Sequence, residues 1–216
     1  MGVSERMNPG HIIVNNLLRE GFARDRILIV KSGTAEIEGC RSVPDIAAIP
    51  DRVDLFVLCV DAAQASAALV EIIEREKAES VVLIPGGLEE KAGSQAIVER
   101  MRAALARSRG SAWGGPVING GNCLGIRSVP GRYDTTFIPE YKLPVPKGEP
   151  SRLAIISQSG AFAVSKASKL NAVNPKYSVT LGNQMDLTVG DYLTYLKDDS
   201  GIDVFAVYVE GFRPLD

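Results

Sequence analysis

Several short stretches of the chain combine glycine with residue types that can hold an anion or a cofactor. The first, GVSERMNPGH over residues 2–11, contains His11, the only histidine among the 216 residues. Asn8 can cap a helix at this point, and Pro9 suits the first helical turn. Free N–H groups and the dipole at a helix start favour phosphate. The spacing is not GxGxxG, so a phosphate loop and an ordinary strand-to-helix turn are equally open.

Lys31 and Cys123 are two further candidates. Lys31 ends an apolar run at the place where dinucleotide-binding folds usually carry an acidic group for the ribose hydroxyls. A cation favours a ligand with an additional phosphate, although a solvated lysine is the ordinary alternative. Cys123 follows Asn122 in INGGNCLGI. A reactive thiol needs a positive neighbour, and none is near in the sequence, so we expect Cys123 to line a site rather than attack.

The stretch IISQSGAF (residues 155–162) reads as a strand, a tight turn and a helix start. Ser157, Ser159 and the following amides can cradle a second anion, with helix capping by Ser159 as the simpler alternative. GxSxG is absent, and a catalytic triad would need the distant His11, so a hydrolase is not expected. Glu210 ends a later strand, where its carboxylate can orient a histidine or a loop, or be solvated.

Alternating helices and strands must position these stretches. Apolar runs typical of buried parallel strands cover residues 26–31, 53–60, 80–87 and 116–120. Helical periodicity covers residues 9–22, 62–79 and about 91–107. This alternation predicts a Rossmann-like, doubly wound α/β domain that binds its ligand at the carboxyl edge of the sheet. The strand that should precede residue 2 is not seen.

A proline-punctuated segment then predicts a connection between two units. We assign residues 1–132 to the first domain, 133–150 to the linker and 151–216 to a second domain. In that domain we expect strands at 152–157, 177–182 and 203–210, with helices from residue 160 and around 188–197. Three strands are few for a free-standing α/β domain, so the second domain is expected to be truncated and the chain to be a fragment or a subunit.

Composition narrows the class of protein. Hydrophobic residues make up 45% and charged residues 23%, with a net charge of −2. This balance argues against nucleic acid as a partner. No apolar run approaches the ~20 residues of a membrane span, and no signal-peptide pattern is present. Three scattered cysteines without CxxC predict no zinc or other metal site and indicate a reducing, cytoplasmic location.

Several motifs, in the same order, resemble the NDP-forming acyl-CoA synthetases, relatives of the succinyl-CoA synthetase alpha subunit. GGNCLGI is similar to the family's GPNCLGI, with Gly121 in place of proline. ISQSGA is similar to VSQSGA, TLGNQMD to SLGN followed by aspartate, and YVEG to YLEG. The resemblance covers essentially the whole chain. It implies a CoA-binding domain followed by a truncated, flavodoxin-like ligase domain.

The resemblance also implies residue roles, with CoA lying across the carboxyl edge of the first domain. The implied CoA contacts are Gly2, Ser4, Arg6, Asn8, Gly10, Lys31, Val60, Asp61, Pro85, Gly86, Gly87, Asn122 and Cys123. The implied phosphate-binding residues of the second domain are Ser157, Gln158, Ser159 and Gly160. Glu210 matches the family's glutamate that hydrogen-bonds a phosphorylated histidine.

In that family an acyl phosphate reacts with CoA, and phosphate passes through the histidine to a nucleotide on a separate ATP-grasp domain. That histidine lies beyond the EG motif, and His11 does not match it. We therefore predict the CoA-binding portion of an acid–thiol ligase that forms no acyl-CoA alone. Expected partners are CoA, a carboxylic acid or acyl phosphate, and an ATP-grasp domain or subunit. A homo-oligomer is also compatible with this interpretation. The alternatives are an NADP-type Rossmann redox protein and a non-catalytic CoA-binding regulatory subunit.

Overall fold

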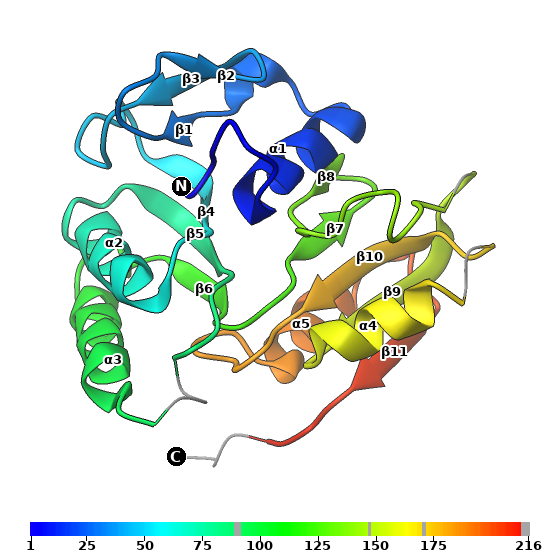
Figure 1. Cartoon of the computed structure of the whole chain (residues 1–216). Helices are drawn as coiled ribbons and strands as arrows, with labels where there is room; N and C mark the ends of the chain where they lie inside the picture. The colour runs from blue at the N-terminus through cyan, green and yellow to red at the C-terminus, as the bar shows by residue number, and fades with distance from the viewer. Residues whose placement is uncertain (89–91, 147, 170–171, 213–216) are drawn as a thin grey trace.

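The computed structural model of the chain describes residues 1–88, 92–146, 148–169 and 172–212 (Figure 1). In these residues the strands form three sheets. Two of the sheets belong to the amino-terminal half, and the third belongs to the carboxyl-terminal half. In this part of the chain no helix is long and apolar enough to cross a membrane.

The central sheet of the first half is parallel, with the order β4-β5-β6. Its strands are β4 (Val53–Leu58), β5 (Ala78–Leu83) and β6 (Val117–Gly120). Helices α2 (Ala62–Glu74) and α3 (Gln95–Arg109) lie on one side of it (Figure 1). Helix α1 (Pro9–Arg19) packs on the other face, where Ile13 meets Val82 and Ile84. Helices on both faces of a parallel sheet confirm the predicted doubly wound α/β class.

Burial explains why the three strands were visible in the sequence. Leu58, Leu83 and Ile118 are completely buried, one from each strand. They share a core with Leu69 of α2 and Met101 of α3. Strands covered on both faces carry continuous apolar runs, and these are the runs that predicted them.

A smaller sheet, ordered β1-β3-β2, lies above the central one in Figure 1. It consists of β1 (Ile29–Val30), β2 (Glu36–Ile37) and β3 (Cys40–Val43), preceded by a 3₁₀ turn, η1 (Arg24–Arg26). Strand β3 runs parallel to β1 and antiparallel to β2. The hairpin turns at Glu38 and Gly39, whose φ values of 53° and 74° are both left-handed. The sequence did not predict this hairpin, because its strands are only two and four residues long.

The third sheet has the order β11-β9-β10-β7-β8. Strands β9 (Ser151–Ser157), β10 (Pro175–Thr180) and β11 (Val204–Tyr208) are parallel, as expected. Helix α5 (Val189–Leu196) contributes Val189 and Leu196 to the core of this sheet. Helix α4 (Gly160–Ala167) follows β9 and contacts it.

Two short antiparallel strands, β7 (Ile126–Ser128) and β8 (Tyr133–Asp134), extend the third sheet on the far side of β10. The sequence did not predict them. They lie where we expected the end of the first domain and the start of the linker. The domain boundaries at residues 132 and 151 stay predictions, but the sheet itself already begins at Ile126.

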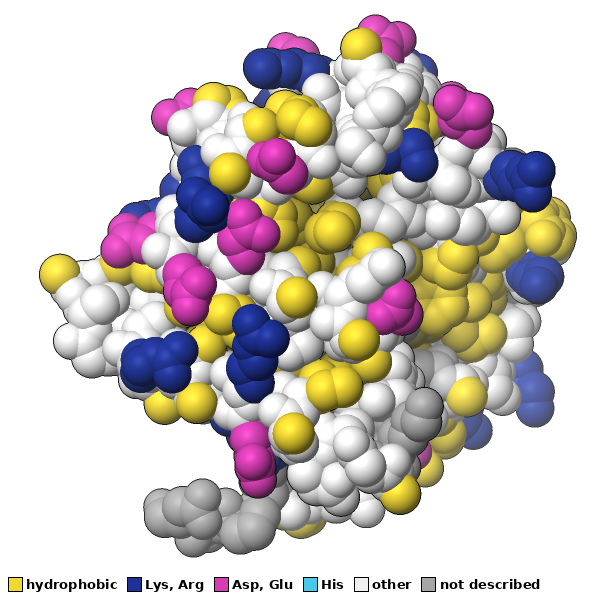
Figure 2. All heavy atoms as spheres, turned by 60° about the vertical axis from the view of Figure 1, so that its left-hand side comes forward, with side chains coloured by type: hydrophobic (Ala, Val, Ile, Leu, Met, Phe, Trp, Pro, Cys, Tyr) yellow, Lys and Arg dark blue, Asp and Glu magenta, His cyan; other side chains and the backbone are white. Residues whose placement is uncertain are grey.

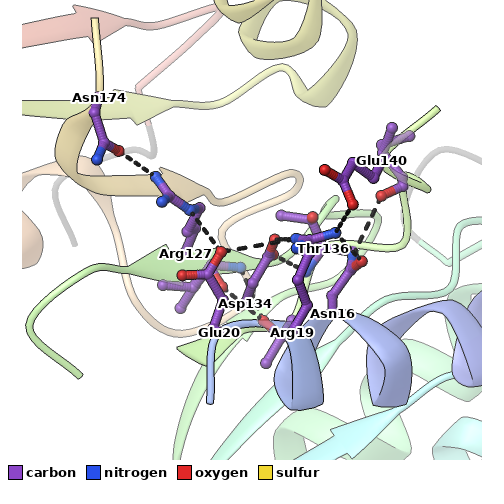
Figure 3. A network of polar contacts seen from close by, with 11 residues as sticks. Asn16, Arg19, Glu20, Arg127, Asp134, Thr136, Glu140 and Asn174 are labelled. Carbon is purple, nitrogen blue, oxygen red and sulfur yellow. Dashed lines mark hydrogen bonds and ion pairs between the residues drawn. The ribbon is translucent and has the colours of Figure 1, made fainter. Parts of the chain in front are cut away.

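A polar network ties α1 to the third sheet (Figure 3). Arg19 Nη2 donates to Asp134 Oδ2 at 3.0 Å, and Arg127 Nη1 donates to Asn174 Oδ1 at 2.8 Å. Glu20 joins the two arginines, at 3.7 Å from Arg19 and 3.4 Å from Arg127. Burial raises the pKa of Asp134, against the lowering effect of the Thr136 hydrogen bonds and Arg19. The network fixes α1, and the loop before it, relative to the second half of the chain.

One expected boundary is wrong by several residues. The helix predicted over 62–79 ends at Glu74, and β5 already begins at Ala78. Between them Glu76 takes a φ of 53°, and Lys77 N–H bonds back to Ile72 O at 2.9 Å. A left-handed residue of this kind ends a helix in the way that glycine usually does.

Candidate functional site

The loop of residues 2–8 crosses the carboxyl end of β4 at very close range. A side chain on Gly2 would place its Cβ 2.1 Å from Cys59 O, and a side chain on Gly10 would place its Cβ 2.4 Å from Gly2 O. Gly2 also has a φ of 98°. Both glycines are therefore required for backbone to pack on backbone. They shape the loop, and neither leaves room for a side chain.

Side chains then hold the loop in its curve. Asn8 Nδ2 donates to Gly2 O at 2.8 Å, while its Oδ1 accepts from His11 N at 2.9 Å and caps α1. Ser4 Oγ donates to Arg6 O at 2.7 Å. The Arg6 side chain is exposed beyond this frame. Arg6 is therefore the cation of the loop that an anionic ligand at this edge can reach.

His11 is a clamp on the loop. The ring is buried, with Nδ1 2.7 Å from Ser4 O and Nε2 3.0 Å from Glu38 Oε1. Both partners are acceptors, so the ring satisfies both contacts when each nitrogen carries a proton. The imidazole thus joins the 2–8 loop to the β2–β3 turn. Sequence reasoning left the role of His11 open and missed Glu38, which only the hairpin brings into reach.

The next candidates stand at the carboxyl ends of β1 and β4. Lys31 follows β1, and its N–H donates to Val43 O at 2.8 Å. Val60 and Asp61 follow β4, and Asp61 Oδ1 caps α2 by accepting from Gln64 N at 3.0 Å. Lys31 and Asp61 therefore occupy the predicted edge, with the Asp61 carboxylate already engaged in capping.

The stretch 85–87 and the glycine-rich loop of residues 120–125 meet at the ends of β5 and β6. Asn122 N–H donates to Pro85 O at 2.9 Å. Asn122 and Gly86 are exposed, whereas Leu88 is fully buried and would meet any Cβ on Gly121 at 2.6 Å. The buried Leu88 side chain therefore leaves no room for a side chain at position 121. Asn122 and Gly86 are the parts of this corner that face outward.

The thiol of Cys123 points into the core and not toward the edge. Cys123 is 3% exposed, and its Sγ lies 3.4 Å from Leu83 O and 3.4 Å from Asn119 Nδ2. Burial raises the pKa of this thiol to about 12. A thiol in this state carries almost no thiolate near neutral pH, so the prediction that Cys123 is not a nucleophile agrees with the geometry.

The candidate phosphate loop of the second half lies between β9 and α4. Ser159 Oγ caps α4 by accepting from Phe162 N at 3.2 Å, and the buried Ser157 donates to Ser159 O at 2.7 Å. Gln158 Oε1 accepts from Glu210 N at 2.6 Å and from Gly211 N at 3.0 Å. The loop therefore also positions Glu210, an exposed residue that follows β11.

The loop of residues 120–125 joins the two sets of candidates. Gly160, at the start of α4, would place a Cβ 3.1 Å from Leu124 Cβ. A Cβ on Gly182 would lie 2.1 Å from Gly121 O and 2.3 Å from Asn122 O. The loop that carries the candidates Asn122 and Cys123 is therefore packed against the start of α4 and against Gly182, although these segments are far apart in the sequence.

Thr180 is the residue that holds this junction, and sequence reasoning missed it. Its buried Oγ1 accepts from Leu124 N at 2.9 Å and Gly125 N at 3.0 Å, and donates to Gly125 O at 2.8 Å. Asn119 Nδ2 donates to Thr180 O at 2.9 Å. The position of Thr180 directly before the Leu-Gly-Asn motif was the available signal.

These loops define a class of protein. Glycine-rich loops with exposed cations gather at the carboxyl edge of a doubly wound sheet, the usual place for a nucleotide-like ligand. A second α/β unit follows, in which β9, β10 and β11 are parallel, and it presents a second capped loop toward the first. This arrangement is that of a nucleotide-binding type of α/β domain joined to a second α/β domain.

Comparison with known families makes the assignment specific. Residues 1–128 match the family described as CoA binding domain, and residues 150–215 match the family described as succinyl-CoA ligase like flavodoxin domain. The chain therefore belongs to the family of CoA binding domains, followed by a succinyl-CoA ligase-like flavodoxin domain. Both parts confirm the resemblance and the fold inferred from the sequence.

Individual relatives point the same way. The chain is 36% identical over 204 residues to acetate–CoA ligase [ADP-forming] I of Archaeoglobus fulgidus, covering 94% of this chain and 28% of that protein. It is 29% identical to the alpha subunit of acetate–CoA ligase [ADP-forming] I of Pyrococcus furiosus, covering 94% of this chain and 43% of the subunit. The chain thus spans less than half the length of these curated relatives.

A solved structure shows the same architecture. The chain superposes on the dinucleotide forming acetyl-coenzyme A synthetase 1 of Ca. Korarchaeum cryptofilum, determined with phosphate and ADP, with a TM-score of 0.83 and 25% identity. The match covers 99% of this chain and 43% of that one. Both halves are therefore arranged as they are in a synthetase of this kind.

Proposed function

We propose that the chain binds coenzyme A across the carboxyl edge of β4-β5-β6. The observation that carries the proposal is the family match of residues 1–128, which contain every candidate CoA contact. The phosphates of CoA would lie beside the 2–8 loop, where Arg6 is exposed on a backbone held by Asn8 and His11. Charge-assisted contacts with arginine are among the strongest that a phosphate makes.

The hydrogen-bond donors near the 2–8 loop are better suited to holding the CoA phosphates with side chains than with the N–H groups at the start of α1. At the start of α1, Pro9 has no N–H, and the N–H groups of His11 and Ile12 already bond to Asn8. Arg6 and Lys31 therefore supply the positive charge, and we assign Lys31 to the adenosine end of CoA. Val60, Asp61, Pro85, Gly86 and Gly87 would follow the ligand toward Asn122 and Cys123, where the thiol end is expected.

Calorimetric titration of the 216-residue chain with CoA, and in parallel with NADP, tests the proposal. We expect saturable binding of CoA and none of NADP at the same concentrations. Binding of NADP alone would overturn the proposal in favour of a Rossmann redox protein. Binding of neither ligand would favour a regulatory subunit that retains the fold without the affinity.

The role of Lys31 is tested with a ligand that lacks one phosphate. CoA carries a 3′-phosphate on its adenosine, and dephospho-CoA does not. If Lys31 contacts this group, Lys31→Ala weakens CoA about tenfold and leaves dephospho-CoA unchanged. Lys197→Ala, in the cap of α5, is the matched control and should change neither. Equal losses for both ligands would place Lys31 elsewhere.

We further propose that the chain works as part of an NDP-forming acyl-CoA synthetase. Relatives are named for acetate and, in one case, for trans-feruloyl-CoA, so the acid remains to be assigned. The Ser157–Gly160 loop would face a phosphohistidine supplied from outside residues 1–216, with Glu210 orienting it. The chain's single histidine is committed to Ser4 and Glu38.

A reconstitution assay tests this larger role. The 216-residue chain alone should form no acyl-CoA from ATP, acid and CoA. Added ATP-grasp and phosphohistidine domains of a relative should restore synthesis, and Glu210→Gln should lower it at least tenfold while leaving CoA binding intact. Synthesis by the chain alone would contradict the assignment of the histidine to another segment.

A further inference from the structure

The side chain of Gln158 accepts two hydrogen bonds from the turn that carries Glu210. Its Oε1 lies 2.6 Å from Glu210 N and 3.0 Å from Gly211 N. Both partners are backbone donors, and in an amide side chain only the oxygen can accept from a donor. The two N–H groups therefore determine which end of the amide faces the turn, and they leave Nε2 directed elsewhere.

The backbone of Gln158 is fixed as well, so this side chain starts from a defined place. Gln158 N donates to Tyr208 O at 2.9 Å, one residue beyond the end of the β9–β11 pairing. On the other side of β9, Gly182 N donates to Gln158 O at 3.0 Å. Gly182 in turn packs against the 120–125 loop. The position of Gln158 is thus set from both neighbouring strands before its side chain reaches the turn.

The end of β11 is held by α4, but the turn beyond it is held by Gln158. β11 ends at Tyr208, whose ring stacks on that of Phe162 in α4, with ring centroids 3.9 Å apart. In the part of the chain that the structure describes, the N–H groups of Glu210 and Gly211 bond to Gln158 Oε1 and to no other acceptor. The direction in which Glu210 leaves the sheet therefore depends on one amide oxygen.

Local contacts, and not a broad electrostatic field, must place the Glu210 carboxylate. The net charge of the chain is −2, and acidic and basic side chains are interspersed among the described residues on the face shown in Figure 2. Groups that take part in a reaction have to be held within about 0.5 Å of their working position. A single hydrogen-bonded support can therefore decide whether this carboxylate is useful.

Two roles for Gln158 correspond to its two ends, and they need opposite chemistry. If Nε2 donates to a phosphoryl group, as the resemblance implies, then the donor end matters and a negative charge at this position is harmful. If Oε1 holds the turn, then the acceptor end matters and a carboxylate can replace the amide. Two consecutive N–H groups bind a charged oxygen at least as well as a neutral one.

We propose that Gln158 is a positioning residue, whose Oε1 sets the place of the Glu210 carboxylate and which needs no contact of its own with the phosphoryl group. The inference rests on the proposed function, in which Glu210 orients a histidine supplied from outside residues 1–216. It assigns Gln158 a different role from the phosphate contact that the resemblance implies.

Hydrogen exchange of the 216-residue chain tests the contact without any activity. Gln158→Met keeps the length of the side chain and removes the acceptor, whereas Gln158→Glu keeps the acceptor. Measured by NMR, exchange of the Gly211 N–H should become about tenfold faster in Gln158→Met and should not become faster in Gln158→Glu. The N–H of Gly201, bonded to Asp199 Oδ1 at 2.8 Å, is the internal control. Unchanged exchange in Gln158→Met would overturn the proposal.

The second test follows acyl-CoA synthesis by the chain together with the ATP-grasp and phosphohistidine domains of a relative. We expect Gln158→Met to lower kcat about tenfold without changing KM for CoA, and Gln158→Glu to keep about half of the kcat or more. Gln95→Met, the same change at an exposed glutamine of α3, is the matched control and should change neither. A larger loss in Gln158→Glu than in Gln158→Met would assign the side chain to the phosphoryl group and overturn the proposal.

A double variant shows whether Gln158 acts through Glu210. Once Glu210→Ala has removed the carboxylate, Gln158→Met should lower kcat by less than about twofold more, because nothing remains to be positioned. A full further loss of about tenfold would contradict the proposal. If the wild-type assembly forms no acyl-CoA, the proposed function fails, whereas the exchange experiment still decides whether Gln158 holds the turn.

Discussion

Two loops lie at the carboxyl edge of the β4-β5-β6 sheet, residues 2–8 and 120–125, and they are held in different ways. The 2–8 loop is fixed by side chains, with His11 and Asn8 reaching back to its carbonyls, and it leaves Arg6 and Met7 exposed. The 120–125 loop is held through its backbone N–H groups, which donate to the distant Thr180 Oγ1, and it buries Cys123 and Leu124. The shape of the 2–8 loop therefore depends on side chains that hold its carbonyl groups. The 120–125 loop is instead packed into the core.

The difference assigns different work to the two loops. A loop that exposes a cation on a side-chain frame suits recognition of a charged ligand. A loop whose N–H groups are bonded to Thr180 suits transmission of position between the two halves of the chain. Substitutions in the second should therefore cost stability first, and substitutions in the first should cost ligand affinity first.

The largest effect is expected from Thr180→Val. The change keeps the shape of the side chain but leaves two buried N–H groups, those of Leu124 and Gly125, without their acceptor. We expect the free energy of unfolding to fall by about 4 kcal/mol. Urea denaturation measures it, with the exposed Ser168→Ala as control. A loss below about 1 kcal/mol would show that the 120–125 loop is not anchored in this way.

The next largest effect is a pH dependence of the free energy of unfolding. It comes from the amine of Met1, the residue directly before the 2–8 loop. The pKa of the Met1 amine falls from 8.0 to about 6 on folding, through burial. Between these values the unfolded chain binds a proton that the folded chain does not, so stability rises with pH across this window. The gain is about 2 kcal/mol. Denaturation at pH 6 and pH 8 measures it, and acetylation of the amine should abolish the slope. A slope that survives acetylation would assign it to other groups.

The His11 clamp should give a smaller stability loss but a clear loss of affinity. We expect His11→Ala to cost about 1–2 kcal/mol of stability and to weaken CoA binding about tenfold, because Ser4 and the loop lose their anchor. Glu38→Ala should show the same trend, and the double variant should be less than additive. Additive losses would mean that the two side chains act separately.

The smallest effect on binding is expected at Cys123. Because burial raises the pKa of its thiol to about 12, Ellman's reagent at pH 8 should leave Cys123 unmodified until the chain unfolds. Cys123→Ala should change the dissociation constant for CoA by less than about twofold. A loss comparable to that of His11→Ala would mean that the Cys123 side chain itself, and not only the backbone around it, contacts the ligand.

The fold could be predicted from the sequence where burial imposes a pattern. Strands such as β4 and β5, covered on both faces, show continuous apolar runs, and Asn8 and Pro9 marked the start of α1 correctly. The short strands of the β2–β3 hairpin carry no such pattern. Strands β7 and β8 were missed for the same reason, and because β10, the strand that joins β7 to the rest of the sheet, comes some 50 residues later.

The candidate site was less visible, since its supports come from distant segments. The motifs located the glycines, but the need for glycine at 2 and 10 comes from backbone contacts between separate turns. The partners of His11 and of the 120–125 loop, Glu38 and Thr180, could not be inferred from spacing. The roles of the predicted contact residues in binding CoA stay predictions.

One calorimetric comparison tests the central claim most directly. Arg6→Ala removes the exposed cation of the 2–8 loop, and Arg75→Ala removes an arginine that follows α2, at the opposite edge of the sheet, where it pairs with Glu71. We predict one CoA bound per wild-type chain, at least tenfold weaker binding by Arg6→Ala, and an unchanged affinity for Arg75→Ala. Absence of CoA binding, or equal affinities for the two variants, would contradict a CoA site at this edge.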